Sequence, residues 1–216
     1  MIKLSKTSKM PCKSFALPAG IKTCIGMFNI EGKVKDVCKG CYAMKGSYSW
    51  RSARNLRDHN LKETKENLGS FHNDMIMLLK REKNDYFRWF DSGDFYDNDL
   101  LYTITSICRL TPEIKHYIPT KAREHLDQDL WEKLEALPNV TLRYSSPSVN
   151  GYYESIHGST VIQKGQNIDE SKVFKCMVGV EPRGLDENGK QLFRKKCEDC
   201  RACWDNPEKV IAYTHH

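Results

Sequence analysis

The chain has 216 residues, of which 39% are hydrophobic and 29% charged, and it carries nine cysteines. This length can bury a sizeable core, and the composition excludes a disordered chain. No apolar run reaches the roughly 18 residues of a spanning helix, so we expect no membrane partner. We also expect no secretory signal, since no apolar stretch follows the first lysines. Cysteines in a reducing compartment point to metal or redox chemistry, because disulfides are rare there.

The positive charge is concentrated at one end of the chain. Residues 1–60 contain 12 Lys and Arg against 3 Asp and Glu, whereas the whole chain has a net charge of +6. Such a segment suits nucleic acid, phosphate or an anionic cofactor, or it only solvates a loop-rich surface. No nucleic-acid-binding motif accompanies the charge, so nucleic acid is a secondary expectation.

The first part of the chain predicts a loop-rich segment, a long helix and a strand. Gly and Pro recur through residues 1–50. Residues 51–81 place apolar side chains at helical spacing, with an interruption at Gly69 and Ser70. Residues 86–91 are rich in aromatics and predict a strand.

The next elements alternate between helix and strand. Asp97 is a suitable N-cap for a helix that ends at Leu110, and residues 115–118 predict a strand stopped by Pro119. The remaining predicted elements are a helix that Thr120 opens and Pro138 ends, and strands at residues 139–144, 159–163 and 209–213.

This alternation is typical of a parallel sheet with crossover helices. We therefore predict an α/β fold in a single domain that spans residues 1–216. Its parts are a loop-rich cysteine segment at residues 1–50, an α/β core at residues 51–146, and a turn-rich cysteine segment at residues 147–216 packed on the core.

Polar residues follow the predicted strands. In parallel sheets, functional residues collect at the carboxyl ends of the strands. Thr120 is explained by helix capping. The sequence Asp91-Ser92-Gly93-Asp94 contains more acid than capping requires, which makes Asp91, Ser92 and Asp94 candidate catalytic residues.

The C-terminal cysteines form the stronger of two groups. Cys197, Cys200 and Cys203 stand at consecutive C-x2-C spacing, with Cys176 upstream. Bacterial ferredoxins use this run for a [4Fe–4S] cluster, whereas zinc usually takes two cysteines from each knuckle. An iron–sulfur cluster is the first interpretation, and zinc or no metal stay open.

The N-terminal group consists of Cys24, Cys38 and Cys41, with Cys12 as an optional member. A lone C-x2-C pair suits zinc, redox chemistry or a cluster. We expect these cysteines to bind a second cluster, or Cys38 and Cys41 to combine with two C-terminal cysteines in one four-thiolate zinc site. Cys108 lies on the apolar stripe of a predicted helix, and we expect it in the core.

Five stretches carry a resemblance to a known family: KLSKTSKMP, CKGCYAMKGSY, FDSGDFYD, YIPTKAREHL and CEDCRACWD. With these motifs the chain resembles the uncharacterised bacteriophage "gene product 88" family over essentially its whole length. If the chain is phage-encoded, as the resemblance implies, we expect it in the cytoplasm of the host cell.

That family is distantly similar to radical S-adenosylmethionine proteins, which bind a cluster through three cysteines in a loop after the first strand of a partial barrel. The similarity implies a truncated (β/α) partial barrel with loop-rich, cysteine-bearing termini. It also implies that Ser92, Gly93 and Asp94 bind S-adenosylmethionine. The gap of thirteen residues between Cys24 and Cys38 departs from the usual three.

We therefore expect an iron–sulfur protein with one or two clusters, as a radical S-adenosylmethionine-like or redox enzyme. Its substrate, a small molecule or a macromolecule, is unknown, and Lys121 and Arg143 are candidates to hold an anionic group. The alternatives are a zinc-stabilised module that binds nucleic acid or a host protein, and a non-catalytic cluster protein for electron transfer or iron sensing.

Overall fold

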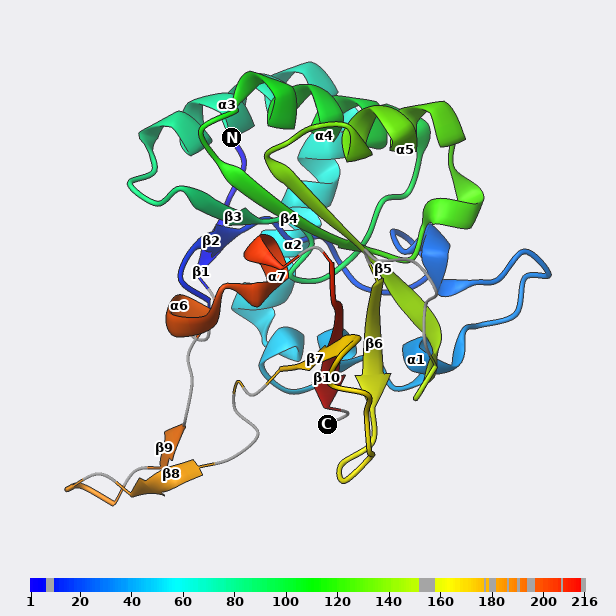
Figure 1. Ribbon diagram of the computed structural model, residues 1–216. Coiled ribbons are helices and arrows are strands. Elements are labelled where there is room, and N and C mark those ends of the chain that lie inside the picture. Colours follow the sequence, from blue (N-terminus) through cyan, green and yellow to red (C-terminus); the bar gives the residue numbers. More distant parts are fainter. Residues whose placement is uncertain are drawn as a thin grey trace.

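The computed structural model describes residues 1–6, 10–151, 158–176, 178, 182–185, 187–189, 191–193, 197–206 and 208–214. Within these residues, eight strands form one open sheet, which confirms the predicted α/β fold (Figure 1). In spatial order the strands are β1 (Ser5–Lys6), β2 (Lys13–Ser14), β3 (Tyr86–Arg88), β4 (Lys115–Thr120), β5 (Val140–Val149), β6 (Gly158–Ile162), β10 (Val210–Thr214) and β7 (Val173–Lys175).

The sheet is mostly parallel. All neighbouring pairs from β2 to β7 run parallel, whereas β1 and β2 form an antiparallel pair. The described strands do not close into a barrel, since β1 and β7 remain at the two edges. A separate hairpin of β8 (Pro182–Leu185) and β9 (Gln191–Phe193) is drawn apart from this sheet in Figure 1.

The longer helices are α2 (Arg51–Glu66), α3 (Leu68–Arg81), α4 (Asn98–Leu110) and α5 (Gln128–Glu135). The last three lie along one side of the sheet (Figure 1). Short helices α1 (Asp36–Lys39), α6 (Cys197–Cys200) and α7 (Ala202–Asp205) belong to the cysteine-bearing segments. In the part of the chain that is described, no helix combines the length and apolar character that a bilayer crossing requires.

The two faces of the sheet differ because side chains alternate along each strand. Phe87, Ile118 and Leu142 point into the main core beneath α3, α4 and α5. The opposite side, here called the α7 face, includes Tyr117 and Arg143, which contact Trp204 and the carbonyl oxygen of Ala202, respectively. The C-terminal cysteine segment therefore packs on the sheet face that the long helices leave free.

The predicted helix over residues 51–81 is two helices, and the break is not at Gly69 and Ser70. Asn67 ends α2 and precedes α3 with φ of −139° and ψ of 50°. The change of direction lets α3 bury Phe71, Met75 and Leu79, which are spaced by four residues. The packing of α3 on the sheet thus explains why the helix breaks at Asn67.

Strand β4 continues through Pro119, contrary to the prediction that proline stops it. The N–H of Lys115 donates to Asp85 on the β3 side, and that of His116 donates to Asn139 on the β5 side. This alternation turns the nitrogen of Pro119 toward the β3 side, where β3 has already ended at Arg88. The missing N–H therefore costs no ladder bond.

The helix predicted from Thr120 begins later. Thr120 is the last residue of β4, and its hydroxyl donates to Asp94 at 2.7 Å. A 3₁₀ turn, η4 (Arg123–His125), intervenes, and Asp127 caps α5 by accepting from Leu130 N–H. The other predicted cap is confirmed, since Asp97 accepts from Leu100 N–H at 2.8 Å.

His116 is expected to make stability depend on pH. Trp89 donates its indole N–H to Nδ1 at 3.2 Å, so Nε2 carries the proton toward Thr111. Burial lowers the pKa of His116 from 6.5 to about 4. The unfolded chain therefore binds the extra proton between these values, and stability falls with decreasing pH across pH 6.5 to 4, by about 3 kcal/mol in all.

Urea unfolding at pH 4.5 and pH 7.5 measures this difference. His116→Gln should remove most of it, whereas His72→Gln on α3 should leave it in place. An equal pH response in wild type and His116→Gln would contradict the assignment.

Candidate metal centres

Four cysteines from two chain segments line one cavity. Cys176 follows β7, and its N–H donates to Ala212 O on β10 at 2.8 Å. Cys197 and Cys200 begin and end α6, and Cys203 lies on α7. Arg201 adopts a left-handed conformation (φ of 49°) between the two helices, which turns the chain so that all four cysteines line the cavity beside Ile211.

The surroundings of this group, here called the C-terminal centre, favour protonated thiols at Cys197 and Cys203. Burial raises the pKa of Cys197 to about 12, and the nearby Cys203, Cys176 and Cys200 raise it further while Arg88 lowers it. Burial also raises the pKa of Cys203, whose sulfur lies 3.2 Å from the hydroxyl of Tyr213. A bound cation would have to displace these protons.

Cys12 lies with the C-terminal centre and not with the cysteines that are near it in sequence. It packs in a buried cluster with Tyr117 and Trp204, against which Cys203 also packs. Burial raises the pKa of Cys12 to about 12, and Cys197 is near enough to contribute. Because β2 pairs with β3, the residue preceding β2 is carried onto the α7 face.

Cys24, Cys38 and Cys41 form a second group, here called the N-terminal centre. Gly20 N–H donates to Cys24 Sγ at 3.4 Å, Cys38 lies in α1, and Cys41 precedes a 3₁₀ turn, η2 (Tyr42–Met44). Burial raises the pKa of Cys24 to about 12 and also that of Cys38. Both thiols lie within electrostatic range of the Asp94 carboxylate and the Lys121 ammonium.

The loop that carries Cys24 is anchored on the end of β4. In η1 (Ile25–Met27), a Cβ at Gly26 would overlap the backbone of Lys121, so glycine allows the closest approach. Lys35, between Cys24 and Cys38 in sequence, donates to Lys121 O at 3.3 Å and to Glu124 at 3.2 Å. These bonds fasten the cysteine segment to the residues that follow β4. The N-terminal centre therefore lies at the carboxyl ends of β3 and β4.

Gly26→Ala is expected to destabilise the protein by about 1–3 kcal/mol, because the added methyl group must displace backbone. Gly69→Ala is the matched control, since nothing lies within 4 Å of a Cβ there. That change in α3 should stabilise by about 0.5–1 kcal/mol. Urea unfolding of both variants measures the difference, and equal effects would contradict the close approach.

The strand-end residues Asp91, Ser92 and Asp94 lie beside the N-terminal centre and have defined partners. Asp91 accepts from Tyr48 OH at 3.1 and 3.2 Å, and Ser92 donates to Leu17 O at 2.6 Å. Gly93 has φ of +79°, and a Cβ there would lie 2.6 Å from that of Leu17, so only glycine fits.

Asp94 is buried and accepts three hydrogen bonds. Its donors are the hydroxyl of Thr120 at 2.7 Å and the N–H groups of Phe95 and Lys121, each at 2.8 Å. Burial raises the pKa of Asp94, and these donors oppose that shift. The carboxylate therefore ties the end of β3 to the end of β4.

Helix α7 and the N-terminal centre lie at different ends of β3 and β4. Trp204 and Asp205 of α7 contact Tyr86 and Lys115, the first residues of β3 and β4. Asp94 and Lys121, by contrast, follow the last residues of those strands. The N-terminal centre therefore lies beyond the strand ends that α7 leaves uncovered.

Arg143 does not serve as the expected substrate-holding residue. It is fully buried on β5, and its guanidinium donates to the carbonyl oxygens of Lys209, Ala202 and Asn206. These bonds fasten α7 to the α7 face. Cys108, as expected, is fully buried within α4 and packs in the main core.

No three His, Cys, Asp or Glu side chains in the described ranges are grouped as a ready-made site for a metal ion. The four thiols of the C-terminal centre surround a small cavity of about 20 Å³, which has room for about one water molecule. Binding of a metal there would therefore require the thiol side chains to rotate.

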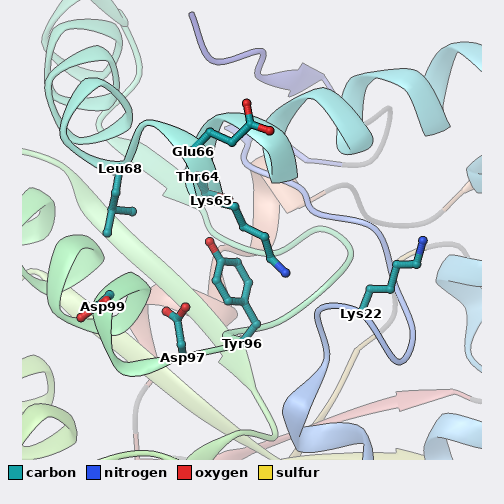
Figure 2. A pocket seen from close by; sticks show the side chains of 8 residues that line it. All are labelled: Lys22, Thr64, Lys65, Glu66, Leu68, Tyr96, Asp97 and Asp99. Carbon is teal, nitrogen blue, oxygen red and sulfur yellow. The ribbon is translucent and has the colours of Figure 1, made fainter.

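A larger cavity of about 610 Å³ lies elsewhere, between the end of α2, the start of α4 and the loop of Lys22 (Figure 2). Figure 2 shows Lys65 beside the ring of Tyr96, and the ammonium nitrogen lies 5.2 Å from the ring centre. Its acidic lining includes Asp97, which caps α4. None of the candidate site residues lines this cavity.

Sequence reasoning missed Arg88, Tyr117 and Tyr213, which lie beside the C-terminal centre on the α7 face. The alternation of side chains along the strands could have placed Arg88 and Tyr117 on the same face, since they are register partners on β3 and β4. Tyr213 was placed in a predicted strand without a role.

The comparisons with known proteins gave one match. A family model described as gene product 88 matches residues 2–206, a range that includes every cysteine of the chain. Neither curated proteins nor solved structures gave a match. Because the family model covers nearly the whole chain, the protein belongs to the gene product 88 family.

Proposed function

We propose that the chain is an iron–sulfur protein in which Cys176, Cys197, Cys200 and Cys203 hold one cluster. The observation that carries this proposal is that these four thiols, from two separate segments, line one cavity. Soft thiolate ligands select iron–sulfur clusters, zinc or copper(I), and the C-x2-C-x2-C run is a ferredoxin pattern.

The surroundings of the C-terminal centre suit a thiolate-ligated group. Arg88 lowers the pKa of Cys197 and Cys203, so its charge offsets part of the negative charge that ligation creates. Tyr213 supplies a hydroxyl at 3.2 Å from Cys203 Sγ, and hydrogen bonds to ligand sulfur stabilise a reduced cluster.

We further propose a second cluster at Cys24, Cys38 and Cys41, with radical S-adenosylmethionine chemistry. Three thiols leave one iron position open to a cofactor, and a cluster there would supply the electron for cleavage of S-adenosylmethionine. In this chain Asp94 already accepts three hydrogen bonds, so its role is to hold the strand ends together beside Cys24 and Cys38. Lys121 offers a cation to the same thiols.

Zinc at the C-terminal centre is the second candidate, because four thiols also suit a tetrahedral structural site. The protein would then be a zinc-stabilised binding module. The two candidates differ in colour, since a zinc protein is colourless and an iron–sulfur protein absorbs in the visible.

Anaerobic purification followed by iron, acid-labile sulfide and zinc analysis tests the proposal. Mössbauer spectroscopy then identifies the cluster type in iron-57-enriched wild type. Cys197→Ala/Cys200→Ala should lose the iron and sulfide of one cluster, whereas Cys108→Ala should keep the full wild-type content of iron and sulfide. The control residue lies in the main core, away from either centre.

Full iron content in Cys197→Ala/Cys200→Ala would contradict the C-terminal assignment. Zinc without iron in anaerobically purified wild type would favour the binding module.

A further inference from the structure

A continuous chain of contacts runs from the C-terminal centre into the α7 face. The sulfur of Cys203 lies 3.2 Å from Tyr213 OH, and Tyr213 OH lies 2.8 Å from Tyr117 OH. The guanidinium carbon of Arg88 lies 5.7 Å from the centre of the Tyr117 ring. Residues of three different strands, β10, β4 and β3, thus meet next to one ligand sulfur.

Arg88 also contacts residues beside the N-terminal centre. One of its nitrogens donates to Tyr42 OH at 3.4 Å, and the other lies 3.5 Å from the Asp91 carboxylate. Tyr42 directly follows Cys41, and its hydroxyl donates to Asp91 O at 2.9 Å. Arg88 is therefore in contact with the residue adjoining one cysteine group while it faces the other.

Arg88 is largely buried, and its partners do not satisfy all of its hydrogen-bond donors. Its side chain is only 18% exposed, and its buried Nε has no hydrogen-bond partner among the described residues. Burial disfavours the charge, but Tyr42, Asp91, Tyr117 and Tyr213 outweigh it and raise the pKa of Arg88 above its ordinary value. A permanent cation is thus held at a costly site beside the C-terminal centre.

We propose that Arg88 is a positioning residue whose positive charge stabilises the reduced, more negative cluster at the C-terminal centre. Tyr213 acts at the same centre, by donating a hydrogen bond to Cys203 sulfur. The inference rests on the proposed cluster and goes beyond it, because it assigns the reduction potential of that cluster to two named side chains.

A redox titration monitored by electron paramagnetic resonance tests this role in anaerobically loaded protein. Arg88→Met removes the charge and should lower the midpoint potential of the C-terminal cluster, whereas Arg88→Lys should restore much of the shift. Tyr213→Phe should lower the potential of the C-terminal cluster and leave the other unchanged. Arg109→Met, which removes the same charge from the exposed end of α4, should change neither.

Iron and sulfide content and circular dichroism show whether each variant loads and folds. If Arg88→Met does not fold, Arg88→Gln replaces it as the uncharged variant. Unchanged potentials in a loaded, uncharged Arg88 variant would overturn this inference and leave the proposed function intact. Wild-type protein that takes up no iron would overturn both.

Discussion

Iron-loaded protein reduced with dithionite is expected to cleave S-adenosylmethionine to 5′-deoxyadenosine and methionine. The double variant Cys38→Ala/Cys41→Ala should lose this activity down to the level of a cluster-free control. Both residues belong to the N-terminal centre, and Cys38 lies within range of Lys121 and Asp94 at the strand ends. Liquid chromatography of the quenched reaction measures the nucleoside product.

Cys176→Ala provides the matched control, because it removes one thiol from the other centre. This variant should retain cleavage if its N-terminal cluster is loaded. Product formation that survives in Cys38→Ala/Cys41→Ala would rule out the N-terminal centre as the site of cleavage. A loaded wild type that forms no product would leave the non-catalytic electron-transfer or iron-sensing protein as the better proposal.

Asp94→Ala is expected to destabilise the fold by about 3–5 kcal/mol, the largest effect on stability among these variants. The substitution leaves Thr120 OH, Phe95 N–H and Lys121 N–H without their acceptor, and buried unsatisfied donors cost about 1–3 kcal/mol each. Urea unfolding gives the free energy, and iron analysis shows whether the N-terminal cluster is lost as well.

Asp99→Ala is the control for removing a carboxylate, since Asp99 lies exposed in the first turn of α4. Its loss should cost well under about 1 kcal/mol. If Asp94→Ala proved no more costly than Asp99→Ala, Asp94 would not tie the strand ends together.

The features predicted correctly are those whose conformation depends on residues close by in the sequence. The cap at Asp97 depends on a side chain three residues from its donor, and the strands and helices of the core depend on periodicity within a short window. The parallel sheet followed from their alternation. Cys197, Cys200 and Cys203 lie within seven residues of chain, and all three line one cavity, whereas their role as ligands stays a prediction.

The features that sequence reasoning missed depend on partners far along the chain. Pro119 fits into β4 because the neighbouring strand β3 has already ended at Arg88. The long helix breaks at Asn67 because α3 buries its apolar side chains in the core. Cys12 lies near Cys197 only because β2 pairs beside β3. Neighbours in sequence carry no signal of such contacts.

The position of β10 between β6 and β7 has a consequence for folding. Pairing of β7 with β10 closes a loop over residues 176–209, which includes Cys197, Cys200 and Cys203. Closing a loop of this length costs about 3 kcal/mol or more in chain entropy. A metal held by Cys176 and the three later cysteines would cross-link the same loop near its closure point.

Metal capture and completion of the sheet should therefore be one cooperative event. A chain that loses its metal would also loosen β10, and the amide hydrogens of Ile211 to Tyr213 would exchange with solvent faster. If the C-terminal centre binds a metal as proposed, its cysteines would cross-link the sheet, and loss of the metal would leave less of the protein fully folded.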